Sequence, residues 1–270
     1  MTRVGFIGLG SQGAPIARRI VDAGYPVTLW ARRAVSLEPF AGVPAAAAPE
    51  ELAAASDLVS ICVTDDSDVE DVVCSERGVL AGLRPGAVIA IHSTVHPATC
   101  RRLAAKAASF QVTVIDAPVS GGAPAAAAGR LLVMAGGPSD VVERCRPVFE
   151  TFGDPVLHLG AEVGSGQMAK LLNNVLFTAN LATAASVLAL GRSLDVDPAR
   201  LAEVIEHGSG NSFALERIAS AGGTLDRIGA HAGPLLRKDV RLMADLAEAA
   251  QVPAATVMAA ANAALALMDC

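Results

Sequence analysis

Short apolar runs alternate with segments of helical periodicity through the first 160 residues of the chain. After a first glycine cluster, apolar residues recur at helical spacing up to Gly24, and further helices are expected to begin near Asp68, Pro97 and Pro138. Short buried strands separated by amphipathic helices are typical of repeated βα units, so the pattern predicts an α/β fold with a mostly parallel, doubly wound Rossmann sheet. The predicted strands cover residues 3–7, 26–30, 58–63, 87–91, 112–115, 131–135 and 155–159.

The second half has a different pattern. Residues 163–192 contain one charge, Lys170, before Arg192, and as a helix they would be about 45 Å long. That length would span a bilayer, but the uncharged run 171–191 contains three asparagines, two threonines and one serine and is too polar for lipid. We therefore predict a buried helix linking two domains. Further helices are expected from Asp197-Pro198, over 235–250 and over 254–268. We therefore predict a Rossmann domain over residues 1–161 and an all-helical domain over 162–270.

Composition excludes several classes of protein. The 270 residues are 52% hydrophobic and 18% charged, enough for a large core. A net charge of −6 gives no basic surface for nucleic acid. The five cysteines include no close pair, which argues against a disulfide framework or a zinc cluster, and the N-terminus has no signal-peptide pattern, so we expect a cytoplasmic protein.

A glycine-rich turn follows the first predicted strand and opens a helix. In this context Gly8 permits the tight turn, Gly10 lets the backbone approach a pyrophosphate, and Gly13 lets the helix lie close to the strand. The unpaired N–H groups of the helix would face the phosphates. The sequence thus predicts a dinucleotide site over Gly8, Leu9, Gly10, Ser11, Gln12 and Gly13.

Arginines, not an acidic residue, follow the second predicted strand. An acidic residue there commonly binds the adenosine ribose, whereas Arg32 and Arg33 suit a 2′-phosphate through charge-assisted hydrogen bonds. They could also be solvated loop arginines. We predict NADP as the preferred cofactor, with NAD possible.

Polar residues follow three other predicted strands, where ligands bind in doubly wound sheets. These segments are Val63-Thr64-Asp65, Ser93-Thr94 and residues 116–122. The acidic run that begins at Asp65 lacks the glycine and distal glutamate of a calcium loop, and we interpret it as a helix N-cap. The pair His92 and His96 lies at a strand-to-helix junction, where helical metal-ligand spacing does not apply, so no metal site is predicted.

Two further features could bind or convert a substrate. Ser120, Gly121 and Gly122 could form a concave site for a carboxylate, although a plain turn would explain the same residues. Lys170 stands in an apolar setting with Asn174 one helical turn away. A free lysine has a pKa near 10.4, proton transfer at neutral pH favours about 7–8, and burial lowers the pKa of an ammonium. A lysine whose ammonium reaches solvent would explain the same pattern.

Taken in order, these motifs resemble the β-hydroxyacid dehydrogenase family, which includes 3-hydroxyisobutyrate dehydrogenases and 2-hydroxy-3-oxopropionate reductases. The resemblance covers nearly the whole chain and rests on the glycine turn, Ser93-Thr94, residues 116–122, residues 166–174 and Lys238-Asp239. It implies an NADP(H)-dependent oxidoreductase that interconverts a short β-hydroxy acid and its semialdehyde or keto form. It also implies Lys170 as catalytic acid/base with Asn174 as partner, Ser120, Gly121 and Gly122 on the substrate carboxylate, and Thr94 and Lys238 near the nicotinamide end. Val63 and Thr64, which follow a predicted strand, are expected at the cofactor as well.

The chain departs from the family pattern at Gln12, where methionine is usual, at Ile91, and at its short C-terminus. Two alternatives stay open: an imine reductase-like enzyme of the same fold, which generally lacks this lysine, and a non-catalytic NADP-binding interaction module. The apolar helical domain has more hydrophobic surface than a small domain can cover alone, so we expect a homo-oligomer, a dimer or tetramer.

Overall fold

The computed structural model describes residues 1–268. The chain divides into two compact units, Met1–Lys170 and Leu171–Cys270. The division falls inside helix α8 (Ser165–Ser193), which contributes to both units. The domain boundary after residue 161 stays a prediction.

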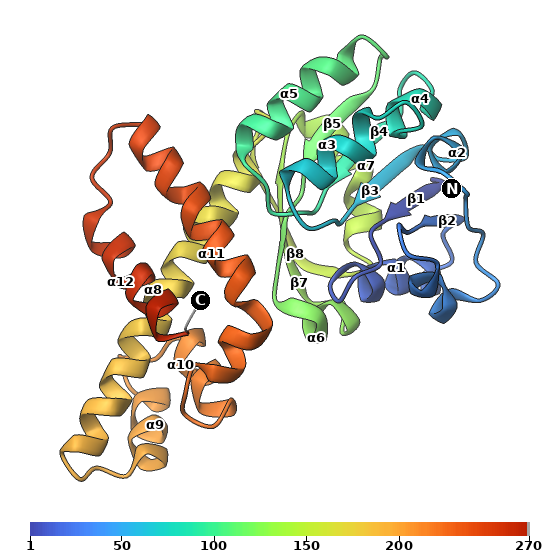
Figure 1. The fold of residues 1–270 in the computed structure, drawn as a ribbon. Helices are drawn as coiled ribbons and strands as arrows, with labels where there is room; N and C mark the ends of the chain where they lie inside the picture. Colours follow the sequence, from blue (N-terminus) through green and yellow to red (C-terminus); the bar gives the residue numbers. More distant parts are fainter. Residues whose placement is uncertain (269–270) are drawn as a thin grey trace. The chain divides into compact units, whose positions relative to one another are not determined.

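An eight-stranded sheet forms the centre of the first unit, in the order β2-β1-β3-β4-β5-β7-β6 with β8 also paired to β7 (Figure 1). The first five strands in this order are parallel, as the alternating pattern predicts. Their bounds are β1 Val4–Ile7, β2 Val27–Trp30, β3 Leu58–Ile61, β4 Val88–Ile91, β5 Thr113–Asp116, β6 Val119–Ser120, β7 Leu131–Gly136 and β8 Gly153–Gly160.

Helices cover both faces of this sheet. One apolar cluster joins α1 and α7 to alternate strand residues such as Phe6, and a second joins α3 and α5 to the intervening residues such as Ile7. Successive strand side chains point to opposite faces, so each of the five parallel strands contributes to both clusters, which makes the sheet doubly wound as predicted. The helices are α1 Gly13–Asp22, η1 Ala34–Phe40, α2 Pro49–Ala54, α3 Asp66–Cys74, α4 Val79–Gly82, α5 Pro97–Ala108, α6 Gly122–Ala127 and α7 Ser139–Phe149.

Strand β7 runs antiparallel to β5 and β6, a departure from the repeated βα pattern. Residues 121–130 connect β6 to β7 and hold one short helix, α6. A parallel crossover needs about a dozen or more residues. This connection is too short, so the chain returns antiparallel.

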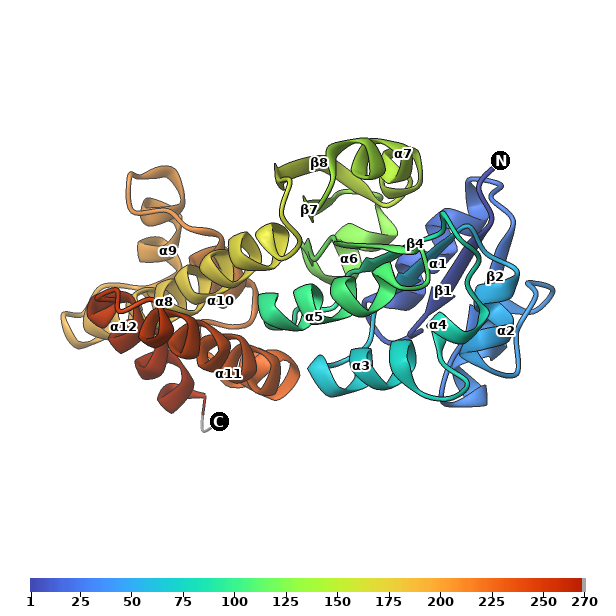
Figure 2. The same cartoon turned by 90° about the horizontal axis from the view of Figure 1, so that it is seen from above.

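The second unit is all-helical, as predicted. Beyond the shared helix α8 it contains α9 Pro198–His207, α10 Phe213–Ser220, α11 Asp226–Ala249 and α12 Ala255–Leu267 (Figure 2). Helix α8 is long and apolar enough to cross a membrane by length and composition, a property shared with the core helices of soluble proteins. Its residues Leu171, Val175 and Leu181 are buried, the last two within the apolar core of this unit.

The predicted start of the helix near Leu235 is wrong. Helix α11 begins at Asp226 and continues through Pro234. Lys238 therefore lies in the interior of a long helix and not near its start.

Candidate functional site

The carboxyl ends of five parallel strands meet in register at one edge of the sheet. Ile7 pairs with Trp30 on one side and Ile61 on the other, and Ile91 pairs with Ile61 and with Asp116. The glycine turn, Arg32, Val63-Thr64 and Ser93-Thr94 all follow these last strand residues. Segments far apart in sequence are thus brought to the edge where ligands bind in doubly wound sheets.

The glycine turn has the close contacts and the free space that a pyrophosphate requires. A Cβ atom on Gly8, whose φ is +96°, would lie 2.1 Å from the carbonyl oxygen of Cys62, and one on Gly13 would lie 1.9 Å from that of Gly8. A Cβ on Gly10 would meet no atom within 4 Å. The space beside Gly10 suits the close approach of a phosphate to the backbone, and the residues present fit a dinucleotide.

Gln12, the residue before α1, gives this loop a buried donor. Its side-chain nitrogen Nε2 has no hydrogen-bond partner among the residues that the structure describes. A buried polar group without a partner costs free energy, and the methionine usual here would not incur that cost. The sequence marked Gln12 as a departure, and the structure shows that the departure leaves an unpaired side-chain nitrogen beside the glycine turn.

Arg32 and Arg33 lie on the exposed loop after β2, as a 2′-phosphate site would require. The Arg32 side chain is 78% exposed, and its Nη1 lies 3.0 Å from Oδ1 of Asp68 on α3. An exposed ion pair of this kind contributes about 0–1 kcal/mol, so Arg32 can exchange this partner for an anionic ligand.

The loops after β3 and β4 are tied to each other. The backbone N–H of Val63 donates to the hydroxyl oxygen of Ser93 over 2.8 Å, next to Thr64 and Thr94. Asp65 caps α3 by accepting from the N–H of Asp68 over 2.9 Å, which confirms the N-cap interpretation of the acidic run.

The two histidines of the strand-to-helix junction have separate structural partners. His92 is buried among Phe6, Phe149 and Phe152, and burial lowers its pKa to about 4. His96 caps α5 by accepting from the N–H of Ala98. Within residues 1–268 no group of three or more metal-binding side chains is found.

Asp116 begins the segment 116–122 that the sequence analysis marked, but no role of its own was predicted for it. Its completely buried carboxylate accepts from the N–H of Gly164 over 2.6 Å and from that of Gln167 over 2.7 Å. Burial disfavours the charged form more than these N–H groups favour it, which raises the pKa of Asp116 to about 6. The carboxylate therefore fixes the start of α8 to the end of β5.

Ser120 ends β6, Gly122 begins α6, and Gly121 lies between them. Gly121 has a φ of +130° and Gly122 a φ of +73°, values that residues with side chains rarely adopt. The turn at these residues is formed by a strand end followed by a short helix. It leaves the backbone of both glycines exposed.

Lys170 lies in the first two turns of α8, with 7% of its surface exposed. Asn174 follows one turn later in the second unit, where its Nδ2 donates to Oδ2 of Asp239 over 2.6 Å. Lys238 lies 3.4 Å from Oδ1 of the same carboxylate. Asp239, buried on α11, is thus the common partner of two residues that the sequence had marked separately.

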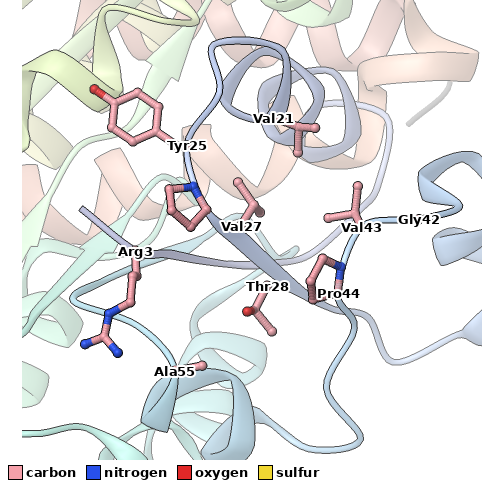
Figure 3. A pocket seen from close by; sticks show the side chains of 10 residues that line it. Arg3, Val21, Tyr25, Val27, Thr28, Gly42, Val43, Pro44 and Ala55 are labelled. Atoms are coloured by element: carbon pink, nitrogen blue, oxygen red, sulfur yellow. The ribbon is translucent and has the colours of Figure 1, made fainter. Parts of the chain in front are cut away.

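The recess drawn in Figure 3 lies elsewhere on the first unit. Its volume is about 430 Å³, and Arg3, Tyr25 and Thr28 are among the side chains that line it. These residues stand near the amino ends of β1 and β2, and the Arg3 guanidinium donates to Asp57. The recess is therefore at the opposite end of these strands from the glycine turn and contributes nothing to the predicted site.

The fold and the glycine turn together define an NAD(P)-binding Rossmann oxidoreductase. Residues 3–160 match the family model described as the NAD binding domain of 6-phosphogluconate dehydrogenase, and residues 164–269 match that of NADP-dependent 3-hydroxyisobutyrate dehydrogenase. The chain belongs to the β-hydroxyacid dehydrogenase family and is an NAD(P)-dependent enzyme of that class.

Similar proteins support this assignment. The chain is 33% identical over 258 residues to the NAD-dependent L-serine dehydrogenase of Pseudomonas aeruginosa, covering 92% of this chain and 86% of the relative. The structure of Mycobacterium tuberculosis 3-hydroxyisobutyrate dehydrogenase with L-serine matches with a TM-score of 0.86 and 28% identity, over 97% and 92% of the two chains. A structure of Psf3 in complex with NADP+ and 2-OPP matches with a TM-score of 0.84 and 29% identity, over 98% and 93%.

The contrast between Gly10 and Gly13 gives a paired test of the glycine turn. Gly10→Ala should leave the free energy of unfolding within about 0.5 kcal/mol of wild type but weaken NADPH binding roughly tenfold or more, because the new methyl group enters the phosphate space. Gly13→Ala should cost about 1–3 kcal/mol of stability through its contact with the Gly8 carbonyl. Denaturant unfolding and fluorescence titration measure both. Unchanged NADPH binding by Gly10→Ala would place the pyrophosphate elsewhere.

Proposed function

We propose that this enzyme interconverts a short β-hydroxy acid and its semialdehyde or keto form with NADP(H), using Lys170 as general acid and base. One observation carries the proposal: a buried lysine lies one turn beyond the point where Asp116 fixes α8 to the carboxyl edge of the sheet. The proposed cofactor loops end at that same edge. Lys170 therefore belongs to the same compact unit as the cofactor site.

Each group has a defined task in this proposal. The nicotinamide supplies or accepts the hydride when bound. Ser120, Gly121 and Gly122 hold the substrate carboxylate and so fix which carbon faces the cofactor. In oxidation the neutral Lys170 amine accepts the hydroxyl proton, and in reduction its ammonium donates a proton to the carbonyl oxygen.

Asn174 and Asp239 support the lysine in this proposal. With its nitrogen engaged by Asp239, Asn174 has a fixed carboxamide whose oxygen retains accepting capacity beside its contact with Asn173. Because the Asn174 oxygen carries no charge, it orients the Lys170 ammonium without the attraction that would keep this group permanently protonated. We propose that Lys238 acts at the nicotinamide end, as the family resemblance implies.

Replacing Lys170 tests the central assignment. Lys170→Ala should retain less than about one per cent of wild-type kcat while NADPH binding stays within about threefold, because the proton-transfer group is lost and the glycine turn is intact. Lys106→Ala, an exposed lysine on α5, is the matched control and should behave as wild type. The assay uses 3-hydroxyisobutyrate, 3-hydroxypropionate, L-serine, their aldehydes and a cyclic imine. Turnover of the imine alone would favour the imine reductase alternative.

The cofactor preference rests on the exposed arginine pair after β2. Arg32→Ala should raise the dissociation constant of NADPH about 10- to 100-fold and change that of NADH little, since a charge-assisted hydrogen bond to phosphate contributes about 1.5–3 kcal/mol. Asp68→Asn should act in the opposite direction, because it removes the carboxylate that competes for Arg32. Arg84→Ala, an exposed arginine at the other end of the sheet, is the control. Equal effects on NADPH and NADH would contradict the 2′-phosphate assignment.

We also propose that the enzyme is a cytoplasmic homo-oligomer, a dimer or tetramer. The second unit exposes large apolar side chains, including Leu176 at 55%, Val204 at 68% and Phe213 at 60%. Surface of this kind is usually covered by association. Sedimentation velocity at micromolar concentration should show a dimer or larger, and a monomer under those conditions would contradict the proposal.

A further inference from the structure

Gln167, in the first turn of α8, has a completely buried side chain with two backbone partners. Its Oε1 accepts from the N–H of Val95 over 3.1 Å, and its Nε2 donates to the carbonyl oxygen of Ser93 over 2.8 Å. These partners stand immediately before and after Thr94. One carboxamide therefore holds the backbone on both sides of a residue proposed to contact the cofactor.

The backbone of Gln167 is held just as closely on the sheet side. Its N–H donates to Oδ2 of Asp116, and the neighbouring Gly166 lies so near β7 that a Cβ there would be 2.1 Å from the carbonyl oxygen of Met134. The first turn of α8 thus has a position set by the sheet. The side chain of Gln167 then transmits that position to the loop after β4.

The connection extends to the loop after β3. Ser93, whose carbonyl accepts from Gln167, also accepts at its hydroxyl oxygen from the N–H of Val63. A continuous series of hydrogen bonds therefore runs from the helix that carries Lys170 to the segments that carry Thr94 and Thr64. Lys170 is three residues beyond Gln167, on the next turn of the same helix.

We propose that Gln167 is a positioning residue that sets the Lys170 ammonium at the correct distance from the loops at the nicotinamide end of the cofactor. The inference rests on the proposed role of Lys170 and adds the group that acts through it. Proton transfer depends on near-contact geometry, and a misplacement of about 1 Å can lower the rate about 100-fold. A side chain that forms hydrogen bonds to the backbone on both sides of Thr94 is well suited to prevent such a shift.

The test compares Gln167→Met with Ser56→Ala. Methionine keeps the approximate length of glutamine but forms neither amide hydrogen bond, so it releases the Thr94 loop with little change in volume. Ser56→Ala also removes a buried hydrogen bond, from the Ser56 hydroxyl to the Leu52 carbonyl, at the opposite end of β3. The pair therefore separates a general loss of stability from a loss of position.

The positioning role predicts three results for the full-length enzyme. With the substrate of the panel that the wild type converts fastest, Gln167→Met should lower kcat about 10- to 100-fold. The dissociation constant of NADPH should rise less than about threefold. The amide hydrogen exchange of Gln167→Met should accelerate in the peptide that contains Val95. Ser56→Ala should lower the melting temperature about as much as Gln167→Met does and keep kcat within about twofold of wild type.

Other results would overturn the inference. A kcat within twofold of wild type in Gln167→Met, or equal losses in kcat and in NADPH binding, would mean that Gln167 has no separate positioning role. Lys170→Ala is measured in parallel to keep the two proposals distinct. Activity in Lys170→Ala overturns the proposed acid/base, whereas an inactive Lys170→Ala beside a normal Gln167→Met overturns the positioning role alone.

Discussion

The contact between the Asp116 carboxylate and the start of α8 is the interaction on which the proposed site depends. A carboxylate at a helix N-terminus accepts otherwise unpaired N–H groups and meets the positive end of the helix dipole. Here that carboxylate is completely buried at the end of β5, so it joins a strand to the helix that carries Lys170. Burial raises the pKa of Asp116 to about 6, which still leaves it largely ionised at neutral pH.

Glycines make this junction possible by removing side chains where backbone must meet backbone. Gly136 on β7 and Gly166 on α8 lie against each other, since a Cβ on Gly136 would be 2.7 Å from the Gly166 nitrogen. The glycine turn after β1 uses the same device, with Gly8 and Gly13 in contact and Gly10 open. At the junction, the missing side chains of Gly136 and Gly166 let α8 approach β7. In the glycine turn, the missing side chain of Gly10 leaves space that suits a phosphate.

Much of the fold and several residues of the proposed site could be predicted because they rest on local patterns. Alternating apolar runs and helical periodicity predicted the parallel strands, and the position of the glycine turn after β1 predicted the dinucleotide loop. Strand β7 was predicted, but its antiparallel direction was not, because that direction follows from the length of a connection. The start of α11 was missed because Pro234 normally ends a helix, and here the helix continues through it.

The sequence by itself determined the chemistry available to this protein: a glycine turn, an arginine pair and one lysine in a long apolar segment. These depend on residue type and on spacing within a few turns. The tertiary structure decided which distant groups serve that chemistry, because Asp116, Gln167 and Ser93 meet through strand order and helix docking, which leave no local signal. Asp116 looked like part of a turn and Gln167 like an ordinary helix residue until the fold placed a buried backbone group opposite each of them.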